Sequence, residues 1–274
     1  MNEQQIQFWN DEAGRRWVDW QEHLDEQLEP VGVVTMDRLG VPAGSSVIDV
    51  GCGCGATTFD LARRVGERGS VTGVDISEPM LEHARKRLAS EKLSNVHFVH
   101  GDAQRAELAE SDLVFSRFGV MFFEHPVEAF ANLRRALGAD GRIGFACWRA
   151  LDLNPFMYVA ARAAGEHVEM PPRPPPGQPG PFAFADGSAR TLLAEAGYQK
   201  IEIEPVDVEL RITRPLEEIL EFLLHIGPAA AAIRASDPGK IEPIRDTLRE
   251  RVKPWTTPEG VAMTAAVWVV TASK

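Results

Sequence analysis

Three glycines alternate with other residues directly after a short apolar run, at Gly51, Gly53 and Gly55. Glycine suits a backbone that turns sharply against a ligand, because a Cβ atom would occupy the space of the ligand. The helix expected after these glycines begins with unpaired N–H groups, which attract an anionic part of a ligand. Asp49 lies just before the first glycine and could accept a hydrogen bond from an amino group. The segment therefore predicts a binding site for a small molecule that carries both kinds of group.

Two more carboxylates, Asp75 and Asp102, each follow a later apolar run. With Ala56, the glycine spacing also satisfies the G-x-G-x-x-G/A pattern of dinucleotide sites, and Asp75 lies near the position of the acid that binds ribose there. That pattern does not require an acid before its first glycine, whereas Asp49 is present here. A nicotinamide-dependent oxidoreductase is therefore the weaker alternative.

The elements that must position these residues alternate between strands and helices. Short apolar runs predict buried strands, and the stretches between them carry apolar residues at helical spacing. The expected strands are residues 46–50, 70–75, 96–100, 111–116 and 142–148, and the expected helices are residues 56–65, 78–88 and 127–137. Such alternation produces right-handed crossovers and a parallel sheet between helical layers. With two later strands, we expect an α/β fold with a doubly wound, mostly parallel, seven-stranded sheet.

The segments outside this alternation divide the chain further. Residues 1–40 are expected to form an N-terminal helical cap, since their tryptophans need a surface to pack on. Residues 41–150 form the ligand-binding core. Residues 151–213 continue it, with a stiff, extended Pro-rich loop at residues 171–181.

The last third of the chain predicts a helical insertion before a final strand. Residues 214–258 have helical periodicity with breaks at Gly227-Pro228 and Pro238-Gly239, and residues 259–274 supply the last strand. An insertion of this length usually carries function, so we expect a lid, with an oligomer contact as the alternative. The strand before it slips by one position in its apolar alternation at Glu204-Pro205, which predicts a bulge or kink at Pro205.

Three segments together resemble the signature segments of class I S-adenosylmethionine-dependent methyltransferases. They are Asp49-x-Gly51-x-Gly53-x-Gly55, Val74-Asp75-Ile76-Ser77 with Met80, and Gly101-Asp102-Ala103. The resemblance covers residues 45–150 and is closest to the small-molecule methyltransferases that are similar to those of ubiquinone and menaquinone biosynthesis. It implies a Rossmann-like methyltransferase fold, S-adenosylmethionine as the cofactor and S-adenosylhomocysteine as the product.

The resemblance also implies a role for each matching residue. Gly51, Cys52 and Gly53 would lie against the methionine part of the cofactor. Asp49 would accept from its ammonium group, and Asp75 would accept from both ribose hydroxyls. The other expected contacts are Ile76 and Met80 on the adenine face, Gly101, Asp102 and Ala103 at its edge, Ser116 and Arg117 at the methyl-transfer mouth, and Trp17 over the methionine end.

The acceptor is expected to be a small, partly apolar molecule. Apolar residues leave strand ends on the cofactor side, where ligands bind in such sheets. They are Phe118, Met121, Phe122, Phe123 and Trp148. The chain also lacks the Asn/Asp-Pro-Pro-Tyr/Phe run that grips a nitrogen in the methylation of nucleic acids and protein glutamine. The nucleophilic atom of the acceptor, O, N or C, stays open.

A catalytic side chain is optional for methyl transfer, because most of the acceleration comes from holding the nucleophile in line with the methyl group. His125, in the loop after the strand at residues 111–116, is the best-placed candidate for accepting a proton, and His225 in the insertion is a weaker one. Two further hypotheses stay open: a methyltransferase-fold enzyme that catalyses a different reaction, and a non-enzymatic partner that binds the cofactor.

The composition of the 274-residue chain disfavours several classes of protein. A net charge of −11 disfavours nucleic acid as a partner, and Arg85-Lys86-Arg87 is interpreted as a solvated helix face. No apolar run reaches the roughly 18 residues of a membrane span, and the first residues do not resemble a signal peptide. The three cysteines do not complete a metal site and fit a reducing compartment. We expect a cytoplasmic monomer or homodimer without a metal.

Overall fold

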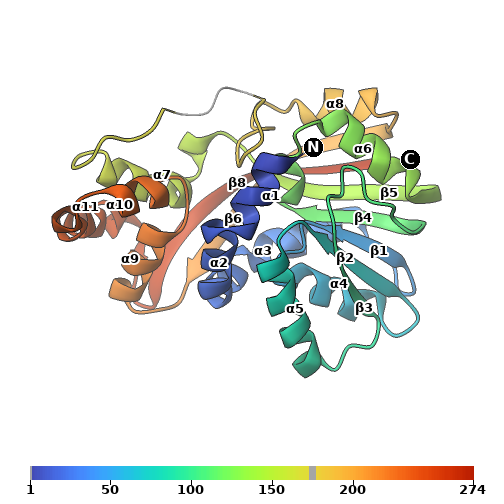
Figure 1. Ribbon diagram of the computed structural model, residues 1–274, viewed down its shortest axis with the longest axis horizontal. Coiled ribbons are helices and arrows are strands. Elements are labelled where there is room, and N and C mark those ends of the chain that lie inside the picture. Colours follow the sequence, from blue (N-terminus) through green and yellow to red (C-terminus); the bar gives the residue numbers. More distant parts are fainter. Residues whose placement is uncertain (1, 173–176) are drawn as a thin grey trace.

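The computed structural model describes residues 2–172 and 177–274. Its sheet has the strand order β3-β2-β1-β4-β5-β8-β6 (Figure 1). A short strand, β7, pairs with β8. The strands are β1 (Ser46–Val50), β2 (Ser70–Asp75), β3 (Val96–His100), β4 (Ser111–Arg117), β5 (Leu137–Trp148), β6 (Gln199–Ile212), β7 (Thr256–Thr257) and β8 (Gly260–Ser273). Strands β1 to β5 are parallel, and β8 runs antiparallel to β5 and β6. The mostly parallel α/β fold expected from the sequence is confirmed, and the short β7 adds an eighth strand to the seven that were expected.

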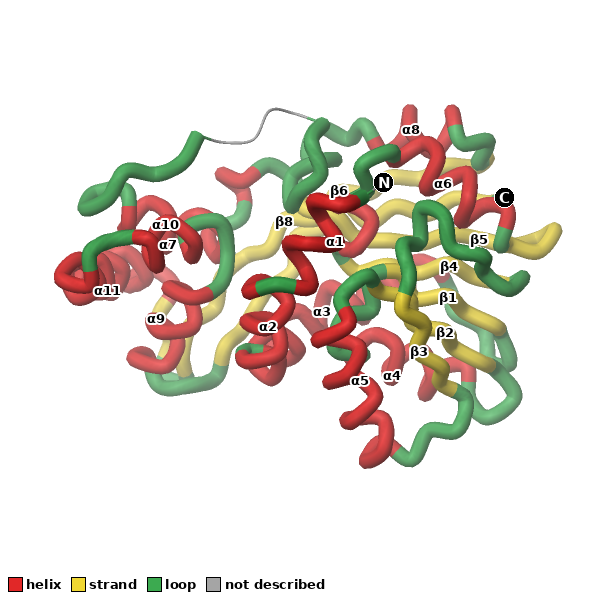
Figure 2. The backbone as a smooth tube through the Cα atoms, viewed as in Figure 1, coloured by secondary structure: helices red, strands yellow, loops and turns green. Residues whose placement is uncertain are grey.

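Helices cover both faces of this sheet (Figure 2). They are α1 (Glu3–Asn10), α2 (Glu12–Asp19), α3 (Gln21–Leu39), α4 (Ala56–Val65), α5 (Glu78–Glu91), α6 (Pro126–Arg135), α7 (Pro155–Ala164), α8 (Ala189–Glu195), α9 (Leu216–His225), α10 (Ala230–Ala235) and α11 (Ile241–Val252). Short 3-10 turns include η1 (Gly119–Phe122), directly after β4. Residues 173–176 of the expected Pro-rich loop lie outside the described residues.

Alternate residues of the central strands pack into two different clusters, one on each face of the sheet. Val47 of β1 packs with Phe59 of α4 and Leu39 of α3. Its neighbour Ile48 belongs to the cluster that contains Phe130 of α6. Because successive side chains of a strand point to opposite faces, a strand buried on both sides is apolar throughout. This explains why β1 is apolar apart from Ser46 and the buried Asp49.

Strands β6 and β8 extend beyond β5 at the carboxyl edge of the parallel strands. The pairing of β5 with β8 stops at Trp148 and Val267, whereas β6 and β8 continue together to Ile212 and Val261. This overhanging hairpin carries the insertion, whose helices α9 to α11 gather beside α7 (Figure 1). The insertion therefore lies off the edge of the sheet where ligands of such folds bind.

The bulge expected at Pro205 is wrong. Register runs without a shift from Glu202 to Ile212, and the irregularity lies between Gln199 and Glu202 instead. In a regular strand, Ile201 and Ile203 lie on the opposite face from the apolar residues Val206, Val208, Leu210 and Ile212. The slip in apolar alternation therefore marks a change in which face of β6 is covered.

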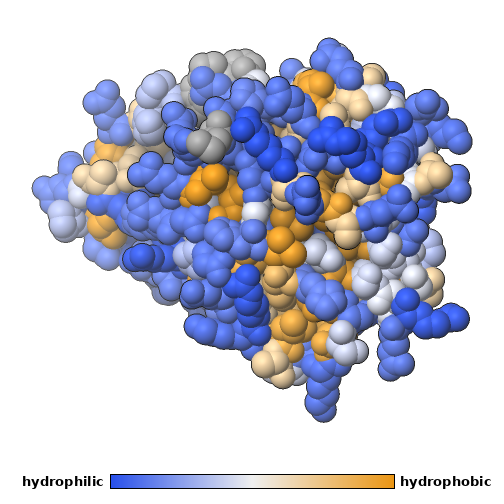
Figure 3. Space-filling model, turned by 45° about the vertical axis from the view of Figure 1, so that its right-hand side comes forward, coloured by the Kyte–Doolittle hydropathy of each residue, from blue (hydrophilic) through white to orange (hydrophobic). Residues whose placement is uncertain are grey.

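The expected helix at residues 127–137 ends at Arg135, because Leu137 already pairs with Ser111 at the start of β5. The breaks expected near Gly227 and Pro238 separate α9, α10 and α11. Among the described residues, no helix is long and apolar enough to cross a membrane. Figure 3 shows one face of the molecule as mostly hydrophilic, with hydrophobic residues gathered toward its middle.

Candidate functional site

The predicted acids and glycines meet where the direction of strand order reverses. From β1 the chain proceeds to β2 and β3 on one side, and β4 lies on the other side of β1. The carboxyl ends of β1, β2 and β4 therefore meet around the loop at residues 51–55, which we call the glycine loop. In open α/β sheets, ligands bind at this reversal.

The glycine loop needs glycine for its backbone conformation. Gly51, Gly53 and Gly55 have φ angles of +69°, +55° and +88°, a region that other residues adopt only with strain. A Cβ atom on Gly51 would lie 2.6 Å from the Cα of Gly119, so the loop also packs directly against η1. At Gly53, a Cβ atom would lie 2.8 Å from the Cε atom of Met80.

Asp49 is fully buried beside the glycine loop, and one of its carboxylate oxygens has no partner. Its Oδ2 atom accepts from the hydroxyls of Thr57 and Thr58, both at 2.7 Å, whereas Oδ1 makes no hydrogen bond with the described residues. Burial raises the pKa of Asp49 to about 6, and the two hydroxyls and the charge of Arg117 oppose that increase. A buried acceptor without a donor is costly, so Oδ1 suits a positively charged ligand group.

Asp75 lies nearly buried at the end of β2 and supports the glycine loop. Its Oδ2 atom accepts from the Gly53 N–H at 2.8 Å, and Oδ1 accepts from the Ser77 N–H at 2.8 Å. Burial raises the pKa of Asp75, and these backbone bonds oppose the increase. Each oxygen retains a second acceptor site for a ligand.

Asp102 follows β3 and is held by Gln104, a residue that the sequence analysis missed. The Asp102 carboxylate accepts from the Gln104 backbone N–H at 3.0 Å and from its side-chain amide at 3.1 and 3.2 Å. The amide oxygen of Gln104 accepts from the His125 N–H at 2.9 Å. Gly101 joins this loop to β2, since its N–H donates to the Asp75 carbonyl at 2.9 Å. Ala103 is buried nearby.

Ser116 and Arg117, at the end of β4, differ in their environments. The Ser116 hydroxyl is buried, donates to the Val50 carbonyl at 2.7 Å and accepts from the Gly119 N–H at 3.1 Å. Ser116 therefore supports the turn after β4 from within the fold. Arg117 is half-buried, passes close to Gly32 of α3, and makes no hydrogen bond or ion pair with any described residue.

Of the remaining loop residues, Cys52 points its thiol toward β2, where it limits the space at Gly73. Met80 is buried, and Ile76 is half-buried at the start of the loop before α5. Burial raises the pKa of the thiols of Cys52 and Cys54, which keeps both protonated. The described residues contain no group of three or more His, Cys, Asp or Glu that could hold a metal ion.

The N-terminal helices dock on the loop that follows Asp75. Asn10 donates to the Ile76 carbonyl at 2.6 Å and accepts from the Glu78 N–H at 2.9 Å, while the Ser77 hydroxyl donates to the Trp9 carbonyl at 2.7 Å. The role of Asn10 was not predicted from the sequence, because nothing local in the sequence says which loop a helix end will meet.

Aromatic rings of the cap and of the segment after β4 pack together. Trp9 packs edge-on against Trp17 and Phe122, with ring centroids 5.9 and 5.1 Å away. Phe118 stacks on Trp148 at 4.1 Å and has a φ of +70°, a strained value for a residue other than glycine. Of the five apolar residues expected to line the mouth, only Phe122 is partly exposed, so the other four belong largely to the core.

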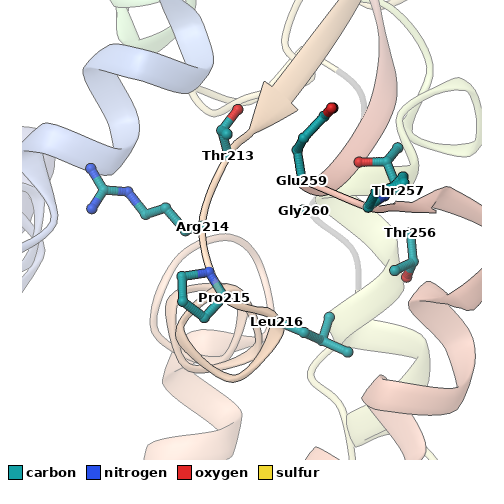
Figure 4. Close-up of a pocket in the computed structure, with 9 residues that line it drawn as sticks. Thr213, Arg214, Pro215, Leu216, Thr256, Thr257, Glu259 and Gly260 are labelled. Carbon is teal, nitrogen blue, oxygen red and sulfur yellow. The ribbon is translucent and has the colours of Figure 1, made fainter.

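His125 lies exposed just before α6, and its imidazole makes no hydrogen bond with a described residue. Its assignment as a proton acceptor stays a prediction, since nothing orients the ring. His225 contacts Trp20 and its own helix. A cavity of about 370 Å³ lies elsewhere, at the base of the insertion between residues 213–216 and 256–260, where the Arg214 side chain points away from the opening (Figure 4).

Comparison with known proteins shows which protein family the residues around this site resemble. Residues 47–141 match the family model described as a methyltransferase domain. That segment is similar to a methyltransferase domain. It contains the glycine loop and the predicted carboxylates Asp49, Asp75 and Asp102, and it ends within β5.

Curated relatives are similar to a part of the chain. Aklanonic acid methyltransferase DauC from Streptomyces sp. (strain C5) is 37% identical over 122 residues, which cover 44% of this chain and 56% of the relative. Demethylmenaquinone methyltransferase from Shouchella clausii is 36% identical over 111 residues, covering 40% of this chain and 47% of the relative. The chain thus matches about half the length of these relatives, and the resemblance to the quinone-type group is confirmed over the domain.

Solved structures share the fold over more of the chain. A SAM-dependent methyltransferase from Aquifex aeolicus is 21% identical with a TM-score of 0.50, covering 75% of this chain and 92% of that chain. The [4+2]-cyclase SpnF is 20% identical with a TM-score of 0.56, covering 93% of this chain and 83% of that chain. The Rossmann-like methyltransferase fold is therefore confirmed.

Proposed function

We propose that this protein binds S-adenosylmethionine at the glycine loop and transfers its methyl group to a small, partly apolar acceptor. The observation that carries the proposal is the buried, unpaired Oδ1 atom of Asp49 beside three glycines with positive φ. An ammonium group in the position of the cofactor's amino acid part would satisfy that oxygen. The residues present therefore fit this cofactor.

The other predicted contacts follow from the same placement. Asp75 would accept from the ribose hydroxyls with the acceptor sites that its two backbone bonds leave free. Met80 and Ile76 would cover the adenine ring, and Asp102, steadied by Gln104, would accept from its amino group. Trp17 and Arg117 would lie toward the methionine end, where Arg117 has no partner within the described chain.

The cofactor would supply an activated methyl group on a sulfonium. The contribution of the protein would be to orient the acceptor and exclude water, for which well-oriented systems gain about 7–11 kcal/mol. The half-buried rings of Trp9 and Phe122 offer flat apolar surfaces for this purpose. A fused-ring acceptor suits such surfaces, and two relatives are named for aklanonic acid and demethylmenaquinone.

We further propose that the protein acts in the cytoplasm as a monomer or homodimer and has no nucleic acid partner. Its three cysteines are free and buried, which suits a reducing compartment. Its net charge of −11 opposes contact with phosphate backbones.

The test combines binding with turnover. Calorimetry should detect S-adenosylmethionine and S-adenosylhomocysteine binding, and incubation with aklanonic acid or a reduced demethylmenaquinone should release S-adenosylhomocysteine. Absence of binding would overturn the proposal. Binding without release across a broad panel of acceptors would favour a different reaction on this fold, of the kind named for the cyclase SpnF.

A further inference from the structure

One basic side chain does not fit the solvated helix face expected at residues 85–87. Arg85 and Lys86 are exposed, but the side chain of Arg87 is only 24% exposed. It reaches from α5 to the glycine loop, where its Nη1 atom donates to the Cys54 carbonyl at 2.7 Å. The expectation for this cluster is therefore wrong for Arg87.

The same guanidinium touches two further elements. Its Nη2 atom lies 2.9 Å from the Asp25 carboxylate of α3, whose side chain is 18% exposed. Its carbon lies 5.3 Å from the centre of the Phe59 ring of α4, within the range of a cation–π contact. Asp25 also accepts from Gln21, and Gln21 contacts His83 at 3.1 Å. Arg87 thus joins α3, α4 and α5 to one carbonyl of the glycine loop.

That carbonyl belongs to a loop held both by backbone hydrogen bonds and by charged side chains. The Gly51 and Cys52 N–H groups donate to the Val74 carbonyl at 2.8 and 3.3 Å, and the Gly55 N–H donates to the Cys52 carbonyl at 2.9 Å. Three of its five residues have positive φ, so the loop has no regular ladder of hydrogen bonds to stabilise it. Asp75 holds the loop through the Gly53 N–H, and Arg87 holds it through the Cys54 carbonyl. Hydrogen bonds from a charged donor are stronger than neutral ones, and this one is partly shielded from water.

We propose that Arg87 is a positioning residue, which holds the glycine loop in its ligand-binding shape through the Cys54 carbonyl and links that loop to α3 through Asp25. The identity of the ligand rests on the proposed function; the effect on the loop does not. A structural ion pair on the surface would affect overall stability slightly, whereas this contact would change the loop itself.

The experiment compares Arg87→Gln with Lys86→Gln, a matched change on the exposed face of the same helix. Hydrogen exchange of the amides at residues 51–55 is measured without ligand, and S-adenosylhomocysteine affinity is measured by calorimetry. Arg87→Gln should speed exchange in the glycine loop by about tenfold or more and weaken binding by a similar factor, as expected for a lost charge-assisted bond. Lys86→Gln should leave both unchanged.

Unchanged exchange at residues 51–55 in Arg87→Gln would overturn the proposal, whatever the affinity. If the unaltered protein binds no S-adenosylhomocysteine, the proposed function fails while the exchange measurement still decides the role of Arg87. Should Arg87→Gln not fold, Asp25→Asn tests the same link with the guanidinium left in place. Asp25→Asn should also speed amide exchange in the glycine loop. In the double variant with Arg87→Lys, the increase in exchange rate should be smaller than the two single effects combined. Full additivity would contradict the link through Asp25.

Discussion

At the scale of single residues, the Asp75 carboxylate is held by the backbone N–H groups of Gly53 and Ser77, one on each oxygen. We expect Asp75→Ala to weaken S-adenosylmethionine binding by about 2–3 kcal/mol, roughly 30- to 150-fold, since two charge-assisted bonds to the ligand are lost. Calorimetry measures the change, with Asp140→Ala, at an exposed position in the irregularly paired start of β5, as the control. Unchanged affinity in Asp75→Ala would remove Asp75 from the site.

Asp49 predicts how cofactor binding depends on pH. Burial raises its pKa to about 6, so the carboxylate that would accept from the ammonium group is largely ionised at pH 7 and protonated at pH 5. Affinity should therefore fall as pH drops through about 6, by up to about tenfold per pH unit. Calorimetry from pH 5 to 8 tests this, and Asp49→Asn should weaken binding and flatten the profile. An affinity that does not change across this range would contradict the assignment.

Without ligand, a fall in pH should have the opposite effect through Asp49: it should increase the free energy of unfolding. The folded state binds a proton on Asp49 at higher pH than the unfolded state, so the contribution of Asp49 to stability increases as pH falls from about 7 toward 4. Denaturant unfolding of the unaltered protein and Asp49→Asn isolates this contribution. A difference in stability that is constant with pH would show that Asp49 does not titrate in this range.

At the scale of elements, the cap and the insertion meet above the carboxyl edge of the sheet. The Arg234 guanidinium of α10 pairs with Glu12 of α2 at 2.7 Å, and Trp20 packs on Phe222 of α9 at 5.5 Å. His23 of α3 contacts Glu218 of α9 at 2.7 Å. This arrangement agrees with the proposed role of the insertion as a lid, with the N-terminal helices as the opposing side.

The insertion also belongs to the core. Its buried residues, among them Ile219, Leu220, Phe222, Ile244 and Leu248, join the same cluster as α7 and the sheet. Removing all of it would expose that cluster, so a reversible restraint is the sharper test of a lid. The ion pair of Glu12 and Arg234 provides the site, because one partner is largely exposed and such pairs contribute little to stability.

We expect that cross-linking Glu12→Cys to Arg234→Cys with a short cleavable bis-maleimide lowers turnover by about tenfold or more, since lid opening often limits release of product. The native cysteines should not react, because all three are buried and burial raises the pKa of each thiol. The variants with only one of the two substitutions, Glu12→Cys or Arg234→Cys, serve as controls and should retain turnover after the same treatment. Full turnover in the cross-linked protein would indicate that these elements do not separate during the cycle.

At the scale of the whole molecule, one continuous cluster of buried residues joins the N-terminal helix α3, the sheet and the insertion. We therefore expect a single cooperative thermal transition. S-adenosylhomocysteine at 100 times its Kd should stabilise the folded state by about 2.7 kcal/mol and raise Tm by roughly 5–10 °C. Scanning calorimetry tests both expectations. Two separate transitions would show that the cap or the insertion unfolds independently.

The sequence by itself determined the strands of the parallel sheet and the residues at their carboxyl ends. A strand buried on both faces is a short apolar run, and this signal depends only on neighbouring residues. Residues 46–50, 70–75 and 96–100 are strands with the expected bounds. Because the carboxyl ends of parallel strands lie at one edge of the sheet, the topology alone predicts that Asp49, Asp75 and Asp102 lie near one another.

The tertiary structure alone decided which distant segments meet these residues. Arg87 has the local pattern of a solvated helix face, yet it contacts Cys54 because α5 crosses the end of the glycine loop. Asn10 docks on Ile76 and Glu78 although nothing near it in sequence indicates a partner. The apolar slip at Pro205 is a change of covered face along β6 and not a bulge. In each case the sequence fixes the chemistry of a side chain, whereas its partner depends on packing between elements far apart in the chain.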